Sequence, residues 1–296
     1  MRERVVLAYA GGLASSMAIA WLNETEGLDV ITVTLDIGQG RDLAELRARA
    51  LACGALRAHA IDARDDFARD VLLPSLHTQR DDLPQAAIAS LPRPFIARKL
   101  VDIAGLEGAR LVAHGSQDPA FDAEIHAIAP TLRVLAPARS WNMTTDELIA
   151  YARQRSMPVG VLRDGAYRID QHLWGRTLTW DGEREPPRLT RLLNEAALVD
   201  IHFDQGVPTS LNGVPMSPAE LIECLSLIAE QHGIGRLDVG SGARRVLVDA
   251  PAAVVLQAAA RAAGGPGTGD VCLKLDEGRF TVIAPQDRQS ALVNYA

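Results

Sequence analysis

The sequence predicts an α/β protein with a doubly wound parallel sheet and a second, smaller α+β domain. In the first half, short β-branched apolar segments alternate with segments of helical periodicity, a pattern typical of parallel sheets covered by helices. In the last third, tight turns such as Asn212-Gly213 separate short strand-like segments, which is typical of hairpins. We therefore expect a sheet domain over 1–165, a linker of mixed charge with a proline pair over 166–195, and an α+β domain over 196–296.

The elements of the first domain follow from hydrophobic periodicity. A strand begins at Val5 and turns through two glycines into a helix that starts near Ser15. Further strands are predicted at 30–35, 58–61, 110–113 and 134–136. Helices are predicted at 43–53, 65–73 and 95–105, and from Thr144, where Glu147 completes a capping box. The polar stretch 74–84 is predicted to be a surface loop.

The second domain is predicted from the same signals. Strands are expected at 198–203, 207–211, 236–239 and 246–248, with a hairpin around 276–278 near the end. The helix expected over 217–232 has the clearest ends, since Ser217 caps it, Pro218 occupies its first position and Gly233 stops it. An alanine-rich helix is expected over 251–263.

Composition limits the class of protein. The 296 residues are 48% hydrophobic and 23% charged, enough to bury a substantial core. A net charge of -7 without a basic face argues against nucleic acid as a partner. No apolar run approaches the length of a membrane span, so we expect a cytoplasmic protein with no membrane association. The cysteines, Cys53, Cys224 and Cys272, are far apart and are expected to be reduced packing residues.

The stretch 5–21, VVLAYAGGLASSMAIAW, is the first candidate site. Gly11 and Gly12 allow the backbone to approach a ligand closely, and Ser15 and Ser16 offer hydroxyl groups. The free N–H groups at the start of the following helix attract phosphate. The alternative is an ordinary connection, because any α/β domain can turn a strand into a helix through glycine.

This loop, AYAGGLASS, resembles the AYSGGLDTS loop that binds pyrophosphate in N-type ATP pyrophosphatases, particularly in the argininosuccinate synthase family. The resemblance covers nearly the whole chain, through VITVTLDIGQ, IDARDDFARD, RPFIARKLVDIA, VAHG, WNMT, IDQHLWGR, HGIGRLD and GDVCLKLDEGRFTVIAPQDRQSALVNYA. It implies an adenine nucleotide alpha hydrolase-like first domain. Full-length members have a helical excursion near GGPGTG and a C-terminal arm, so a changed homo-oligomer or a protein partner is expected.

The resemblance also implies an ATP-dependent C–N ligase. Members adenylylate the ureido oxygen of citrulline, release pyrophosphate and let the amine of aspartate displace AMP, with Mg²⁺ as an expected companion of ATP. The residues expected at the nucleotide by their match to the family are Ala8, Tyr9, Ala10, Gly11, Gly12, Ser15, Ser16, Thr34, Leu35 and Gly115. A substrate of amino-acid type, with a ureido or carboxylate group, is expected near His114, Asp122 and Arg168.

The sequence departs from the family in both parts of this expected site. Ala10 and Ala14 stand where the family loop has a hydroxyl and a carboxylate, and the run 117–127 keeps only Asp122 of the family's TGKGNDQVRFE. Arg168 replaces a serine that meets citrulline. No residue is therefore assigned a catalytic role. A divergent ligase and a catalytically inactive module for nucleotide or protein binding are alternative predictions.

The substrate candidates also have purely structural interpretations. His114 is either a packed histidine or a ligand contact at the sheet edge. Arg168 either pairs with a nearby acid and faces solvent, or anchors a carboxylate. Asp118, Asp122 and His126 recur every four residues, which favours a solvated helix face over a metal site because no second ligand cluster supports the metal.

Overall fold

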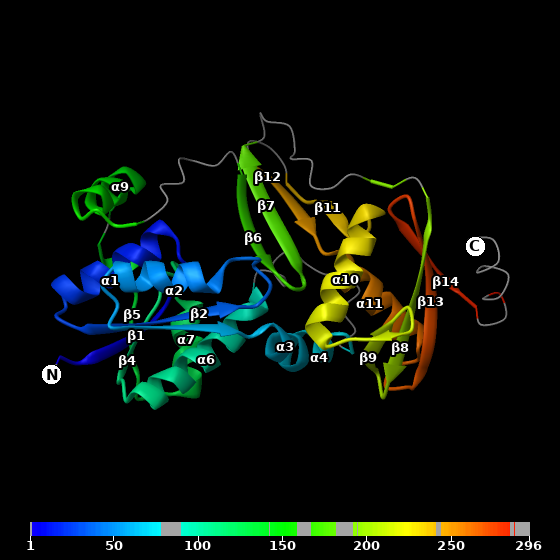
Figure 1. The fold of residues 1–296 in the computed structure, drawn as a ribbon, viewed down its shortest axis with the longest axis horizontal. Coiled ribbons are helices and arrows are strands. Elements are labelled where there is room, and N and C mark those ends of the chain that lie inside the picture. Colours follow the sequence, from blue (N-terminus) through cyan, green and yellow to red (C-terminus); the bar gives the residue numbers. More distant parts are fainter. Residues whose placement is uncertain are drawn as a thin grey trace. The chain divides into compact units, whose positions relative to one another are not determined.

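The computed structural model describes residues 2–77, 90–141, 143–158, 167–181, 192–193, 195–240, 244–284 and 287. The chain forms two compact units. The first comprises Met1–Asp36, Gly40–Ala63 and Leu91–Arg163, and the second comprises Ile37–Gln39, Arg64–Ser90 and Asp164–Ala296. Each unit has its own sheets and its own helices (Figure 1).

The first unit is built on a five-stranded parallel sheet in the order β3-β2-β1-β4-β5. Its strands are β1 Arg4–Ala8, β2 Asp29–Asp36, β3 Arg57–Asp62, β4 Leu111–Ala113 and β5 Arg133–Leu135. Its helices are α1 Leu13–Glu24, α2 Leu43–Ala52, α6 Pro92–Glu107, α7 Ala120–Ile128, α8 Pro137–Ser140 and α9 Thr145–Gln154. The prediction of a doubly wound parallel sheet is confirmed.

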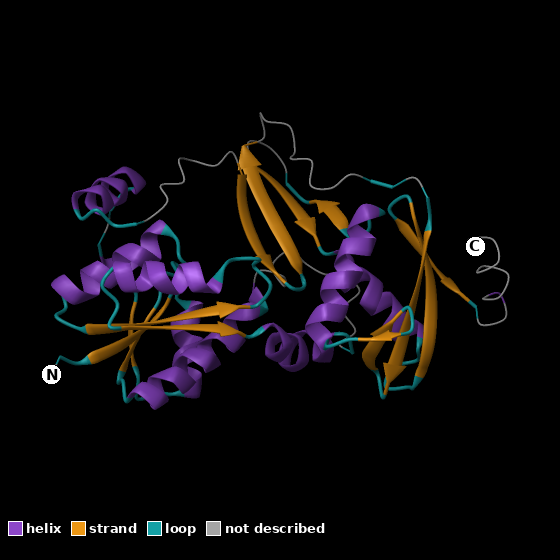
Figure 2. Cartoon of the chain, viewed as in Figure 1, coloured by secondary structure: helices purple, strands orange, loops and turns teal. Residues whose placement is uncertain are grey.

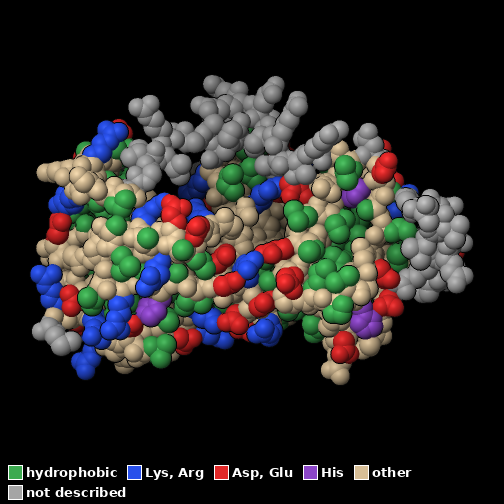
Figure 3. All heavy atoms as spheres, viewed as in Figure 1, with side chains coloured by type: hydrophobic (Ala, Val, Ile, Leu, Met, Phe, Trp, Pro, Cys, Tyr) green, Lys and Arg blue, Asp and Glu red, His purple; other side chains and the backbone are tan. Residues whose placement is uncertain are grey.

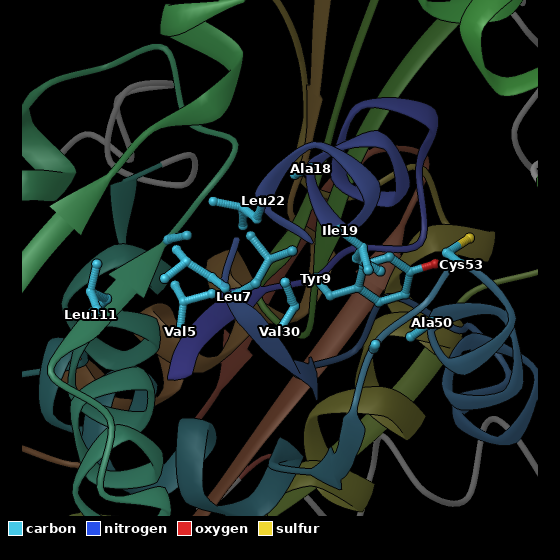
Figure 4. Packing of buried hydrophobic residues seen from close by; sticks show 13 residues of the cluster. Val5, Leu7, Tyr9, Ala18, Ile19, Leu22, Val30, Ala50, Cys53 and Leu111 are labelled. Carbon is cyan, nitrogen blue, oxygen red and sulfur yellow. The ribbon is translucent and has the colours of Figure 1, made fainter. Parts of the chain in front are cut away.

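Two hydrophobic clusters cover the two faces of this sheet. Successive residues of a strand point to opposite faces, so Val5 and Leu7 join Ile19 of α1 and Ala50 of α2 (Figure 4). On the other face, Val6 packs in a cluster with residues of α6 and α7. The central strand β1 is thus buried on both sides, and its end is held in a fixed position.

The second unit contains two antiparallel sheets, in the orders β10-β9-β8-β13-β14 and β11-β12-β7-β6 (Figure 2). Its strands are β6 Tyr167–His172, β7 Gly175–Asp181, β8 Ala197–Asp204, β9 Val207–Leu211, β10 Val214–Pro215, β11 Arg236–Asp238, β12 Arg244–Asp249, β13 Gly269–Asp276 and β14 Arg279–Ile283. Its main helices are α10 Pro218–Gln231 and α11 Pro251–Ala262. This confirms the α+β character expected for the second half.

Several elements differ from the predictions. Helix α1 begins at Leu13, before Ser15, because Gly12 already serves as its N-cap. The helix predicted over 65–73 is divided into α3 Arg64–Phe67, the π-helix η1 Ala68–Leu72 and α4 Leu73–Ser75. Strands β6 and β7 lie within the stretch 166–195, where a linker was expected. β6 is an edge strand whose residues 168–171 are exposed, so its composition is polar and resembles that of a loop.

Other predictions can be compared only in part. Most of the loop predicted over 74–84 lies outside the described residues, and so does the proline pair near residue 186. The closing hairpin is present, with Glu277 and Gly278 at positive φ between β13 and β14. Among the described residues, no helix is long and apolar enough to cross a membrane. The three cysteines form no disulfide among the described residues, and Cys53 and Cys272 are buried.

The surface carries both signs of charge. On the face drawn in Figure 3, acidic and basic side chains are interspersed. A nucleic-acid interface usually shows a continuous basic patch, and the face in view carries none.

Candidate functional site

The sheet order places a candidate site at the ends of β1 and β4. From β1 the chain proceeds to β2 and β3 on one side, and it then returns to β4 on the other side of β1. Parallel sheets bind ligands at such a switch point, beside the carboxyl ends of the two strands that flank it. The loop after β1 contains Gly11 and Gly12, and the loop after β4 begins with His114 and Gly115.

The fold requires glycine at only one of the two glycine positions of the first loop. Gly11 has φ +73, and a Cβ placed there would lie 2.1 Å from Cδ2 of Leu46. The fold of the protein therefore requires glycine at position 11. Gly12 has an ordinary extended conformation, with φ -80 and ψ 171, and a Cβ there would meet nothing within 4 Å. The space beside Gly12 is open where the backbone enters α1.

The start of α1 is suited to an anion. Gly12 has no side chain that could cap the helix, and the first turn of α1 contains no acidic residue. The first intrahelical bond runs from the Ser16 amide to the Gly12 carbonyl, 3.0 Å away. The N–H groups before Ser16 have no carbonyl of their own helix to bind, and together with the helix dipole they attract negative charge.

The two serines of the loop are engaged inside the fold. Ser15 donates its hydroxyl to the Gly12 carbonyl at 3.0 Å. Ser16 is fully buried, and its hydroxyl lies 3.0 Å from the hydroxyl of Tyr9. Burial raises the pKa of Tyr9, so this phenol remains neutral. Both hydroxyl groups hold the loop in place, whereas the sequence suggested that they face the ligand.

Two arginines bind the backbone of the same loop. Arg41, which precedes α2, donates from Nη1 to the Ala10 carbonyl at 2.6 Å. Arg49, on α2, donates from Nη1 to the Gly11 carbonyl at 2.9 Å and also pairs with Glu45. Neither arginine was found from the sequence, although Arg41 lies just before the helix that follows the second strand and Arg49 lies on it. A basic residue just before that helix or on its inward face is the signal that could have found them.

Residues at the end of β2 form hydrogen bonds with Tyr9, just before the loop. The amide of Tyr9 donates to the Val33 carbonyl at 2.8 Å, and the hydroxyl of Thr34 donates to the Tyr9 carbonyl at 3.1 Å. Thr34 is buried, whereas Ala8 and Leu35 are half-buried. These expected nucleotide residues thus meet at one sheet edge, and Thr34 acts through the backbone of Tyr9.

At the end of β4, His114 is buried and oriented by two partners. Its Nδ1 accepts from the Ser116 amide at 3.1 Å, so the ring proton resides on Nε2 and is donated to Asp122 at 2.7 Å. Phe121 packs edge-on against the imidazole ring, with 4.8 Å between the two ring centroids. Burial lowers the pKa of His114 although Asp122 opposes this effect. The neutral imidazole is therefore the form present near neutral pH.

Both carboxylate oxygens of Asp122 have protein partners. The oxygen that His114 leaves unused accepts from Nη2 of Arg139 at 2.6 Å. Burial tends to raise the pKa of Asp122, but the bonds from Arg139 and His114 outweigh it and lower the pKa. Asp122 is consequently an ionised carboxylate that is already satisfied by the protein.

The remainder of the second loop is tied down in a similar way. Asp118 binds Arg93 at 2.6 Å and accepts from the Ala120 amide at 3.0 Å. Gln117 donates to the Ala138 carbonyl at 3.2 Å. Gly115 is exposed at the sheet edge. Gln117 and Asp118 are therefore held by α8 and α6 as well as by the backbone of their own loop.

Arg168 lies on β6, which belongs to the second unit. Its Nε is 3.2 Å from Oδ2 of Asp170, and both side chains are mostly exposed. Asp249, the last residue of β12, is buried and binds Arg176 at 2.6 Å. Burial raises the pKa of Asp249, and Arg176 opposes this rise.

The donor groups around the first loop do not suit a protein-held Mg²⁺. This ion prefers carboxylate oxygens together with substrate phosphates, but Ala10 and Ala14 offer neither hydroxyl nor carboxylate. Within the part of the chain that the structure describes, no three His, Cys, Asp or Glu side chains gather as metal ligands would. Asp118, Asp122 and His126 therefore form no such group.

Comparisons with known proteins extend over both units. Residues 4–158 match the model of the arginosuccinate synthase N-terminal HUP domain, and residues 167–265 match that of the arginosuccinate synthase C-terminal domain. An argininosuccinate synthase of Dictyoglomus turgidum is 40% identical over 276 residues, which cover 86% of this chain and 69% of that protein. One from Bacillus cereus is 40% identical over 280 residues, with the same coverage.

A similarity to a solved structure is weaker. An NH3-dependent NAD synthetase from Campylobacter jejuni has a TM-score of 0.36 and 14% sequence identity, over 53% of this chain and 66% of that chain. This likeness is too low to bear on function. The two domain models and the 40% identity decide the matter. The chain belongs to the argininosuccinate synthase family.

Proposed function

We propose that this protein binds ATP at the loop after β1 and acts as an ATP-dependent C–N ligase of the argininosuccinate synthase type. The observation that carries the proposal is the turn through Gly11 and Gly12. It joins the buried central strand to an uncapped helix, with open space beside Gly12. A phosphate group placed there would meet free N–H groups and the positive end of the α1 dipole.

The proposed reaction has two steps. A ureido or carboxylate oxygen of the first substrate attacks the α-phosphorus of ATP, the bond to the bridging oxygen breaks, and pyrophosphate leaves. An amine then attacks the activated carbon, and AMP leaves with the transferred oxygen. The N–H groups at the start of α1 would stabilise the charge that develops on pyrophosphate, since positioning and charge stabilisation supply most of the rate in such transfers.

The substrate pair is proposed to differ from citrulline and aspartate. Asp122 is the one side chain kept from the family's TGKGNDQVRFE run, and His114 and Arg139 already occupy its two oxygens. Phe121 adds an apolar ring beside them. A carboxylate in this condition gains little from an incoming ammonium group, because binding would require one of two short bonds to be given up. Mg²⁺ is proposed only as a counter-ion that accompanies ATP.

Turnover tests this proposal. The purified protein is incubated with ATP and a panel of ureido, guanidino and carboxylate compounds, with and without amines, and AMP and pyrophosphate are measured. We expect release that depends on an added first substrate and exceeds the release from ATP alone. Exchange of a heavy-oxygen label between the bridging and non-bridging positions of the β-phosphate detects the first step without knowledge of the amine. Absence of release and of exchange across the panel would contradict the ligase proposal.

The second candidate is a catalytically inactive module that binds nucleotide or a protein partner. The bonds that satisfy Asp122 and Asp118 within the protein favour it. In that case ATP binds, measured by calorimetry, but no AMP forms and no label exchanges. Cytoplasmic location and assembly as a homo-oligomer, or with a protein partner, are proposed from the family resemblance. Light scattering on the purified chain tests the self-association.

A further inference from the structure

The inference concerns the charges that surround the loop after β1. Arg41 reaches the loop from the turn before α2 and binds the carbonyl group of Ala10. Arg49 reaches it from α2 and binds the next carbonyl group, that of Gly11. The next residue, Gly12, is the N-cap of α1. Two guanidinium groups are thus fixed on the backbone that leads directly to the uncapped helix.

The charge of these two arginines is only partly compensated. Among the described residues, Arg41 has no carboxylate within salt-bridge distance, and Arg49 shares its charge with the exposed Glu45. The loop itself adds no acid, since Ala10 and Ala14 are neutral. A bond to a backbone carbonyl uses a donor but leaves the positive charge intact. Arg41 therefore places beside the loop a positive charge that no carboxylate in the described part of the chain pairs with.

A guanidinium group can supply what a loop-bound cation supplies. It is permanently charged, and its five N–H donors match phosphate oxygens in a bidentate geometry. Arg41 uses one donor and Arg49 uses two in the contacts described above, so both keep donors for a ligand. The carbonyl groups that they bind would otherwise present negative oxygen atoms to an approaching phosphate.

We propose that Arg41 and Arg49 neutralise the pyrophosphate portion of the nucleotide directly, so that polyphosphate binding by this chain does not depend on Mg²⁺. The inference rests on the proposed ATP binding and specifies how it is achieved. The neutral residue Ala14 fits this arrangement, because a carboxylate in the first turn of α1 would repel a phosphate at the start of that helix unless it held a metal ion.

The test uses ATP and inorganic tripolyphosphate as probes in calorimetry, once with Mg²⁺ and once with EDTA. For the unaltered chain we expect the two dissociation constants for each probe to agree within about threefold, well under the tenfold that corresponds to one lost charge-assisted bond. Arg41→Gln should weaken binding in EDTA by about 10- to 100-fold, the range expected for a hydrogen bond to a charged group. Ala14→Asp should weaken binding in EDTA and recover it when Mg²⁺ is added.

Arg47→Gln is the matched control. Like Arg41, Arg47 is an exposed arginine that donates to a backbone carbonyl, but it lies on α2 and its partner is Ala58 on β3, at 3.2 Å. Its removal should leave both dissociation constants unchanged. Equal effects of the Arg41 and Arg47 substitutions, or loss of wild-type binding in EDTA alone, would overturn the inference and leave the proposed function standing. Absence of binding in both buffers would instead contradict the proposed ATP site itself, and the inference with it. Unfolding midpoints confirm that each variant is folded.

Discussion

The ends of β1 and β4 are neighbours in one sheet, yet they use their charged side chains in opposite ways. After β1, Arg41 and Arg49 bind backbone carbonyl groups, and only Arg49 also pairs with a carboxylate, that of the exposed Glu45. After β4, Arg139 and Arg93 bind the carboxylates of Asp122 and Asp118. Arg41 thus leaves the first loop a positive charge that can attract an anion, whereas both arginines at the second loop are paired with carboxylates.

This difference bears on the proposal that the substrate pair differs from citrulline and aspartate while ATP binding is kept. A phosphate site needs backbone N–H groups and positive charge, and glycines and arginines supply both without a precise set of side chains. An amino-acid site needs several side chains that stay unpaired until the substrate arrives. At the β4 end, His114 and Asp122 are paired with each other, and Phe121 packs against the His114 ring. Nucleotide binding is thus expected to be the more durable of the two.

The largest effect is expected for Gly11→Ala at the β1 end. Its φ of +73 disfavours any side chain, and the new Cβ would lie 2.1 Å from Cδ2 of the buried Leu46. Together, backbone strain and overpacking should cost about 2–4 kcal/mol of the free energy of unfolding. Urea denaturation measures this loss. In a Leu46→Ala background the same substitution should cost less, and an equal cost in both backgrounds would contradict the proposed clash.

The sequence predicted the scaffold of this comparison better than its contacts. The run Val5–Ala8 and the following glycines were enough to place β1 and α1, because burial on both faces produces a continuous apolar strand. The family match located His114 and Asp122. It did not reveal that they bind each other, since these residues are eight positions apart and meet only when α7 packs beside β4.

The arginines at the loop were beyond sequence reasoning for a different physical reason. Arg41 is 31 residues from the carbonyl that it binds, and Arg49 is 38 residues from its partner. Long flexible side chains find partners that depend on the packing of α2 against the sheet, which periodicity does not specify. Ser16 shows the reverse case, since its hydroxyl was expected to face a ligand but is buried against Tyr9.

The next largest effect is expected for Asp122→Ala at the β4 end. This change leaves the buried Nε2–H of His114 without an acceptor and Arg139 without its carboxylate. The unsatisfied buried donor should cost about 1–3 kcal/mol in the free energy of unfolding. Glu24→Ala is the matched control, because Glu24 also accepts from an arginine and from a second side chain but is exposed. Glu24→Ala should lower the free energy of unfolding by about 0.5 kcal/mol. Equal losses in both variants would show that the buried contacts of Asp122 stabilise the protein no more than an exposed ion pair does.

A smaller effect is expected from pH, again at the β4 end. The pKa of His114 in the folded protein lies below its ordinary value of 6.5 because of burial. As the pH falls below 6.5 the unfolded chain takes up this proton first, so the free energy of unfolding decreases. The pKa of Asp122 is likewise below its ordinary 3.8, and its contribution is lost only in stronger acid. The decrease between pH 7 and pH 5 should be smaller in His114→Gln, since denaturation of this variant lacks that proton. An identical pH profile would show that burial does not keep His114 neutral.

The smallest effect on stability, combined with a large effect on binding, is expected for Gly12→Ala. Alanine accommodates φ -80 and ψ 171, and its Cβ would meet no atom within 4 Å, so the free energy of unfolding should change by less than about 0.5 kcal/mol. If phosphate binds in this open space, the methyl group occupies its place, and calorimetry should show ATP binding weakened about tenfold or more, as expected when one or more charge-assisted bonds are lost. Gly105→Ala is the control, because it also meets nothing within 4 Å but lies on α6, away from the loop. The fold itself does not require glycine at position 12. A loss of ATP binding in Gly12→Ala but not in Gly105→Ala would therefore show that ligand binding requires this glycine. Unchanged binding would remove the main distinction drawn between the ends of β1 and β4.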